Sequence, residues 1–276
     1  MSHFLHLGPA RCATTWQARV FSHHPSLFVP TSKDTEYFSH QFARGEAWYR
    51  QQFSRAQEHQ LQGELCHRYF WHPEAPARAR AFNPHFKIII TLRDPFERIM
   101  SAYQYDRTLY LNSAVTLTQY LNFPAVRAAN DYTGNLQRWQ NHFDAQNILL
   151  TMYEDISLDE KKWLEDIWSH LRVPSHWEDS WSQPLWKARV ARNETLAHFA
   201  FGVSQLLRRH GFFQLVGFTK NQSWLERTLF RNGKAPLQFS ATDWNDSLKI
   251  IHRIYDHWER VHGTLPAGWR RPDERA

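Results

Sequence analysis

The segment 87–92, Lys-Ile-Ile-Ile-Thr-Leu, constrains the fold more than any other part of this 276-residue chain. It is a continuous apolar run, rich in β-branched residues and bounded by turn-forming residues. Such a run is typical of a strand buried on both faces of a parallel sheet. Asp94 and Pro95 follow almost at once, and proline suits the first turn of a helix. We therefore expect a buried central strand that leads directly into a helix.

Other apolar runs alternate with helical patterns along the chain. Further strands are predicted at residues 4–7, 27–29, 64–70 and 147–153. Helices are predicted at residues 160–171, 193–209 and 243–262. This alternation predicts an α/β fold, a single domain over residues 1–276 with a central parallel sheet flanked by helices, as in P-loop NTPases. We expect a nucleotide-binding core at about 1–173 and a mostly helical part at about 174–276.

Composition narrows the class of protein. The formal charge is +6, from 33 Lys and Arg against 27 Asp and Glu, and apolar residues make up 42% of the chain, which excludes disorder. Two cysteines, Cys12 and Cys66, are too few for a disulfide scaffold or a multi-cysteine zinc site. No apolar run approaches the roughly 20 residues of a membrane span, and we expect no signal segment at the start of the chain. We expect a cytoplasmic protein that binds a small anion, without a membrane span or a nucleic-acid partner.

The loop at residues 8–16 follows the first predicted strand and opens a helix. Strand, loop and helix in this order form a phosphate site at the helix N-terminus. The loop offers backbone N–H groups, the hydroxyls of Thr14 and Thr15, and the fixed charge of Arg11. We expect Thr14 or Thr15 to cap the helix. The second glycine and the lysine of a nucleotide-triphosphate loop are missing, which disfavours a kinase.

A second anion site is predicted at the end of the strand 87–92. Arg93 stands at its carboxyl end, where open α/β sheets bind ligands, and Ser101 lies two turns into the next helix. A guanidinium can hold a phosphate through two hydrogen bonds, and a serine hydroxyl can add a third. In the alternative interpretation, Arg93 pairs with Asp94 or Glu97 and Ser101 only packs.

Both constellations resemble motifs of sulfotransferases that use 3′-phosphoadenosine 5′-phosphosulfate (PAPS). The loop resembles their 5′-phosphosulfate loop, K-[ST]-G-T-T-W, through the residues Arg11, Cys12, Ala13, Thr14, Thr15 and Trp16. Arginine for lysine keeps the charge but changes its shape. Ala13 in place of glycine asks for a normal φ at that position. Residues 92–103 match every fixed position of the 3′-phosphate motif R-[DN]-P-x-x-R-x-x-S-x-Y.

The resemblance covers about residues 4–173 and implies roles for individual residues. Arg93 and Ser101 would bind the 3′-phosphate, and Arg98 would support the turn. Residues 33–38, 45–49 and 153–156 are similar to segments of heparan-sulfate-type members, in which a tyrosine matched by Tyr153 and the tryptophan matched by Trp16 lie near the adenine. Arg231 and Gly233 stand in a segment similar to the R-K-G that cytosolic members use for the 3′-phosphate.

The function implied is transfer of a sulfuryl group from PAPS to a hydroxyl or amine of a glycan or small-molecule acceptor, with PAP as the product and no metal. Two alternatives remain. One is a catalytically inactive protein that binds PAP or a glycan on the same fold, and the other is a P-loop-like kinase. The acceptor and the oligomeric state stay open.

One group must take the acceptor proton, and two candidates compete. His67 aligns with the base of cytosolic members and has a suitable ordinary pKa near 6.5. Asp34 stands where heparan-type members place a glutamate one methylene longer. We favour His67 slightly over Asp34. Arg11 is the candidate for stabilising the transferring group. Cys12 opens a helix, which lowers a thiol pKa, so its alkylation is predicted to block the site.

Overall fold

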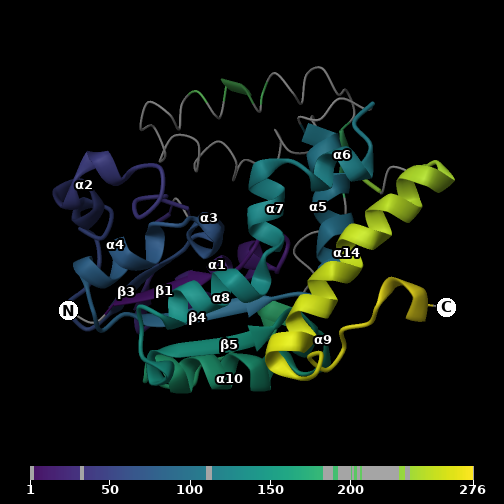
Figure 1. Ribbon diagram of the computed structural model, residues 1–276. Coiled ribbons are helices and arrows are strands. Elements are labelled where there is room, and N and C mark those ends of the chain that lie inside the picture. The colour runs from purple at the N-terminus through teal and green to yellow at the C-terminus, as the bar shows by residue number, and fades with distance from the viewer. Residues whose placement is uncertain are drawn as a thin grey trace.

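Five parallel strands form the main sheet, in the order β2-β3-β1-β4-β5. The computed structural model describes residues 3–31, 34–109, 114–182, 189–191, 200, 202–203, 206, 230–233 and 237–275. The strands are β1 (His3–Leu7), β2 (Leu27–Phe28), β3 (Leu61–Leu65), β4 (Lys87–Leu92) and β5 (Ile148–Met152). The predicted α/β class with a parallel sheet is confirmed. β4 is interior and parallel as predicted, and β1 beside it takes the middle position (Figure 1).

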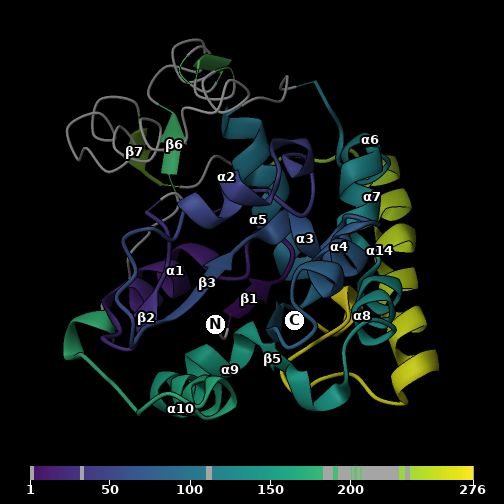
Figure 2. The ribbon, with the colours of Figure 1, turned by 90° about the vertical axis from the view of Figure 1, so that its left-hand side faces the viewer.

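Helices cover both faces of this sheet. They are α1 (Thr14–His23), α2 (Glu46–Gln51), α3 (His67–Trp71), α4 (Ala75–Phe82), α5 (Pro95–Leu109), α6 (Leu117–Leu121), α7 (Pro124–Asn130), α8 (Tyr132–Gln140), α9 (Tyr153–Leu158), α10 (Glu160–Leu171) and α14 (Ala241–His262). Figure 2 shows α1 and α14 on opposite sides of the sheet. After residue 174 the described chain holds α14 and an antiparallel pair, β6 (Arg189–Ala191) with β7 (Phe230–Asn232).

Alternating side chains of β1 enter two separate hydrophobic cores. Leu5 and Leu7 belong to the larger core, which α3, α8 and α14 complete. Phe4 belongs to the smaller core, which α1 and α10 complete. All five residues of β1 are buried. This explains why the strand lacks the polar alternation of a half-exposed strand.

Two local predictions are wrong. Residues 64–70 do not form one strand, because β3 ends at Leu65 and α3 begins at His67. Tyr69 and Phe70, which look like strand residues, are buried from a short helix instead. Neither predicted threonine caps α1, since its N-cap is Ala13 and Thr14 is the first helical residue.

Of the helices predicted at 160–171, 193–209 and 243–262, the first and the last are present. α10 has the predicted bounds, and α14 begins two residues before the predicted start at 243. Both helices begin with a side-chain cap, Asp159 for α10 and Ser240 for α14. The helix predicted at 193–209 falls mostly on residues outside the described part of the chain.

Candidate functional site

The predicted anion loop leaves the middle strand at the carboxyl edge of the sheet. Leu7 of β1 pairs with Ile90 of β4, so the loop and Arg93 begin side by side. Gly8 starts the loop with φ +144°, and a Cβ there would lie 2.2 Å from the carbonyl oxygen of Thr91. Only glycine fits so close to the neighbouring strand. The exit of β1 is therefore fixed by this one residue.

The loop backbone is left-handed at two residues that are not glycine. Arg11 has φ +78° and Ala13 has φ +59°, so the normal φ expected at Ala13 is wrong. Each such residue costs roughly 1–2 kcal/mol and persists where its surroundings hold it. The side-chain amide of Gln17 donates to the Cys12 carbonyl at 3.1 Å, and the guanidinium of Arg93 donates to the Arg11 carbonyl at 3.1 Å. A turn of this kind at a helix N-terminus forms a concavity of N–H groups that suits an anion.

Two arginines and one serine meet beside this loop. Arg11 donates from Nε to the Ser101 hydroxyl at 3.0 Å and lies over the ring of Tyr105 at 4.7 Å. Arg93 lies over the ring of Tyr153 at 4.4 Å, and its buried Nε has no hydrogen-bond partner in the described structure. The structure thus gathers residues from both predicted motifs at one edge of the sheet.

The alternative pairing of Arg93 is present only in weak form. Its guanidinium lies 3.6 Å from Glu97, whose side chain is 46% exposed. Asp94 pairs instead with Arg275. Arg98 is buried and donates to Asn130, and its guanidinium faces Tyr132.

The aromatic residues expected near an adenine flank the same edge. Trp16 donates from its ring nitrogen to the Trp181 carbonyl at 2.9 Å and lies 5.8 Å from the ring of Trp163. Tyr153 opens α9, directly after β5. Trp16 and Tyr153 both pack, partly buried, against the smaller core.

Cys12 does not have the reactivity predicted for it. Its side chain is fully buried, and burial raises the pKa of the thiol to about 12. The expectation of a lowered pKa is therefore wrong, because removal from water outweighs the neighbouring arginines. A buried neutral thiol is a poor nucleophile, so the predicted block by alkylation loses its basis.

The two competing base candidates form one pair. Oδ1 of Asp34 lies 2.9 Å from Nδ1 of His67 and accepts a hydrogen bond from the His67 backbone at 3.1 Å. Asp34 is held in turn by its own N–H, which donates to the Leu65 carbonyl at 3.0 Å. Leu65 pairs with His6 of β1. The pair therefore stands beside the anion loop, at the end of the adjacent strand.

A buried carboxyl that the sequence analysis missed supports this pair. Glu64 is 0% exposed and accepts hydrogen bonds from the backbone and hydroxyl of Thr35, at 3.2 and 2.7 Å, and from the hydroxyl of Tyr69 at 2.7 Å. Burial raises the pKa of Glu64 to about 7, against the lowering effect of these hydrogen bonds. The available signal was an acidic residue directly before Leu65 and Cys66 in a predicted strand, because an acid that is buried there has to be hydrogen-bonded.

The bonds of Glu64 hold a strained turn. Asp34 and Glu36, on either side of Thr35, have φ +61° and +58°. Glu36 is also paired with Arg68 at 2.8 Å. The turn that presents Asp34 to His67 is therefore fixed from both sides.

Other predicted residues are less well placed. Arg231 lies in β7, opposite Val190 of β6, and its side chain is outside the described structure. β6 packs against α5, the helix that carries Ser101. Gly233 follows β7 and is exposed. The role of Arg231 and Gly233 stays a prediction.

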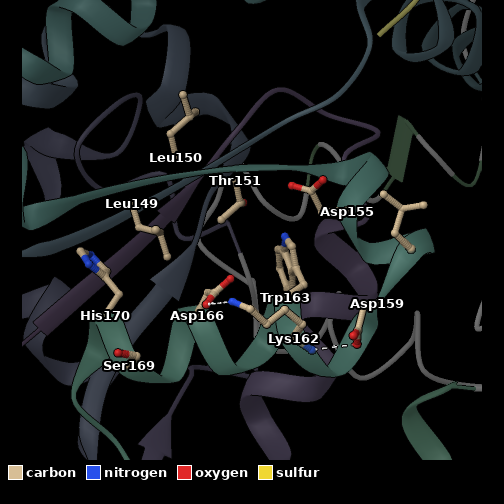
Figure 3. Close-up of a pocket in the computed structure, with 11 residues that line it drawn as sticks. Leu149, Leu150, Thr151, Asp155, Asp159, Lys162, Trp163, Asp166, Ser169 and His170 are labelled. Atoms are coloured by element: carbon tan, nitrogen blue, oxygen red, sulfur yellow. Dashed lines mark hydrogen bonds and ion pairs between the residues drawn. The ribbon is translucent and has the colours of Figure 1, made fainter. Parts of the chain in front are cut away.

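A pocket without any of the predicted site residues lies beside β5 and α10. Figure 3 shows it along β5 and α10, where Thr151, Asp155 and Trp163 line a space of about 580 Å³. Trp163, which lines the pocket, contacts the ring of Trp16.

Two features are absent from the described residues. No cluster of three or more His, Cys, Asp or Glu side chains that could hold a metal ion occurs among them. Within the same residues, no helix has both the length and the apolar character needed to span a membrane.

The strand order and the anion loop after the middle strand define an α/β protein of the P-loop-like class. Residues 2–199 match the family model of the sulfotransferase domain, which is more than half of the chain. The protein therefore belongs to the sulfotransferase domain family. A sulfotransferase structure from Alicyclobacillus acidocaldarius shares the fold, with a TM-score of 0.58 and 21% identity, covering 78% of this chain and 96% of that one.

Relatives with known names match shorter stretches. Heparan sulfate glucosamine 3-O-sulfotransferase 3B1 of Homo sapiens is 28% identical over 147 residues, which are 49% of this chain and 37% of that protein. Bifunctional heparan sulfate N-deacetylase/N-sulfotransferase 1 of Caenorhabditis elegans is 24% identical over 187 residues, which are 61% of this chain and 22% of that protein. The chain thus spans well under half the length of these two relatives.

Proposed function

We propose that this protein is a PAPS-dependent sulfotransferase that moves a sulfuryl group to a hydroxyl or amine of its acceptor by in-line displacement. One observation carries the proposal. Three adjacent parallel strands, β3, β1 and β4, end at the same edge of the sheet and deliver the His67–Asp34 pair, the anion loop and Arg93 in that order. A base, a phosphosulfate site and a 3′-phosphate site are the parts that the reaction needs.

The residues present fit the nucleotide. Among the described residues, Nε of Arg93 has no hydrogen-bond partner, and its guanidinium lies over the Tyr153 ring at the end of β4, where it could bind a phosphate. Ser101 adds its hydroxyl. The loop N–H groups at the start of α1, with Thr14 and Thr15, would hold the 5′-phosphosulfate. Trp16 and Tyr153 would flank the adenine.

In the proposed mechanism His67 is the base and Asp34 is its partner, which the 2.9 Å contact between the two side chains supports. With Nδ1 of His67 turned to the carboxylate, Nε2 is the nitrogen that takes the acceptor proton. Asp34 fixes the tautomer and stabilises the imidazolium that forms. The acceptor oxygen or nitrogen forms a bond to sulfur while the bond from sulfur to the 5′-phosphate oxygen breaks. Arg11 and the loop N–H groups stabilise the charge that PAP carries away.

A glycan is the proposed acceptor class. It is supported by the relatives, whose names specify heparan sulfate. A small-molecule acceptor is the alternative, because these relatives match only part of the chain. The cytoplasmic location also stays a prediction, which fractionation of cells that express the protein would test.

Binding of PAP tests the proposal first. A ligand that binds only the native state raises its stability by about 2.7 kcal/mol at a hundred times its Kd, which raises the Tm of a chain this size by about 5 °C or more. We expect this rise with PAP and not with ATP or AMP. Arg93→Ala should abolish it, whereas Arg50→Ala, which removes an exposed arginine paired with Glu46, should not. No rise with PAP in the unmodified protein would overturn the proposal, and a rise with ATP alone would favour a kinase.

Transfer of labelled sulfate from PAPS then identifies the acceptor. A panel of glycans with free hydroxyls or amines is compared with small alcohols and amines. Transfer to any of them that His67→Ala abolishes supports the mechanism. Binding of PAP without transfer to any acceptor would favour the inactive binding protein.

A further inference from the structure

The segment that follows α14 folds back onto the turn between β4 and α5. Figure 1 shows it in yellow, leaving the end of α14 beside α9. The segment contacts Asp94, whose side chain is buried with 1% exposed. One carboxylate oxygen of Asp94 accepts from the Tyr255 hydroxyl at 2.9 Å and from the Arg270 backbone at 3.0 Å. The other caps α5 through the Glu97 backbone at 2.9 Å.

Arg275 completes this contact with two ion pairs. Its guanidinium lies 2.6 Å from Asp94 and 2.7 Å from Glu97, and it stacks on Phe96 at 4.9 Å. A fork that holds two carboxylates at once suits arginine and not lysine. Arg275 thus neutralises both acids that follow Arg93 in the sequence.

Glu97 is shared by two arginines in unequal fashion. One of its oxygens lies 2.7 Å from Arg275, and the other lies 3.6 Å from Arg93. The carboxylate is therefore the nearest competitor for the charge of Arg93. Without Arg275, Glu97 and the buried Asp94 would be left without their cation beside the proposed phosphate site.

From this arrangement we propose that Arg275 is a positioning residue for the nucleotide site, which it serves by holding Glu97 and Asp94 away from Arg93. The inference rests on the proposed function. It assigns the segment after α14 a part in binding a nucleotide that it does not touch. Arg275 leaves the guanidinium of Arg93 available to a 3′-phosphate and lowers the negative charge that a phosphate would meet.

The test is the Kd of PAP, measured by calorimetry on the full chain. We expect Arg275→Gln to raise the Kd about tenfold, since an uncompensated carboxylate near a phosphate acts at short range in a medium of reduced dielectric. Arg271→Gln is the matched control. Arg271 lies in the same segment and makes two ion pairs, but with Asp256 and Glu259 of α14. Its substitution should leave the Kd unchanged.

A second variant separates positioning from simple support of the fold. The double variant Arg275→Gln/Glu97→Gln should restore the Kd to within about twofold of the original, because Asp94 keeps its hydrogen bonds from Tyr255 and from the backbone of Arg270 and Glu97. Support of the fold would not be restored in this way. Should Arg275→Gln fail to fold, Glu97→Gln alone still decides, because removal of the competitor must tighten PAP binding.

The outcomes are distinct. If the unmodified protein does not bind PAP, the proposed function falls and this inference falls with it. If the unmodified protein binds PAP but folded Arg275→Gln binds it equally well, only the role of Arg275 is overturned. The same holds if adding Glu97→Gln to Arg275→Gln does not restore the Kd of PAP. A Glu97→Gln variant that binds PAP more weakly than the unmodified protein also overturns that role.

Discussion

Replacement of Glu64 by glutamine should change how the stability of the protein depends on pH. Burial raises the pKa of this carboxyl from 4.5 to about 7. Below pH 4.5 it is protonated in both the folded and unfolded states, and it contributes no pH dependence. Between pH 4.5 and 7 the unfolded chain releases the proton that the folded protein retains, so the unmodified protein loses stability as pH rises. Above pH 7 the loss is complete.

The size of the effect follows from the shift. A change from 4.5 to about 7 corresponds to about 3 kcal/mol of unfolding free energy lost across this range. Glutamine does not titrate. Its carbonyl can accept from Thr35 as one carboxylate oxygen does, and its amide can face the Tyr69 hydroxyl. The difference in stability between Glu64→Gln and the unmodified protein should therefore rise by about 3 kcal/mol from pH 4.5 to pH 7.5.

Urea unfolding at a series of pH values measures this difference. Other groups titrate in both proteins and cancel in the comparison. One such group is His6, whose pKa burial lowers to about 3, so that its effect on stability appears as pH falls below its ordinary pKa. Glu64→Ala is the control, because it removes the same titration and the hydrogen bonds as well. A difference that stays flat between pH 4.5 and 7.5 would refute the burial argument for Glu64.

Three further predictions concern the site. His67→Ala should lower kcat by roughly 10²–10⁴, and Asp34→Asn should also lower kcat, as steady-state kinetics would show. Calorimetry should find the Kd of PAP unchanged in both variants. A full rate in both would exclude the pair as the base. Gly8→Ala should destabilise the protein by about 3 kcal/mol or more, measured by urea unfolding, because the new Cβ meets the Thr91 carbonyl oxygen at 2.2 Å. Cys12 should react with a thiol reagent only on unfolding, and rapid native modification would contradict its burial.

Elements with strong apolar periodicity could be predicted from the sequence. Strand β5 was predicted at 147–153 and spans Ile148–Met152, and α10 has the predicted bounds. The spacing of apolar residues along each element indicates which of its faces are buried. The strand prediction at 64–70 is wrong because Tyr69 and Phe70 suit a buried strand and a short buried helix equally well. Only the turn after Leu65 decides between strand and helix.

Two contacts between segments far apart in the sequence could not be predicted. Asp34 and His67 appear in the sequence as two alternative bases. Their spacing does not show that the end of β3 brings His67 back to the loop that carries Asp34. The contact of Arg275 with Asp94 joins residues still further apart and has no local signal. The reactivity of Cys12 was predicted from its place at a helix start, whereas its burial depends on the whole core.

Backbone strain is concentrated where the reaction is proposed. Of the five non-glycine residues described with positive φ, four lie in the loops that follow β1 and β2: Arg11, Ala13, Asp34 and Glu36. Such strain persists only where other groups over-determine the backbone. Here the Arg11 carbonyl is held by Arg93, and the turn around Thr35 is held by Glu64. Because the groups that fix the loops belong to the site or border it, the loops are set before the nucleotide or acceptor arrives, and little ordering remains for binding to supply.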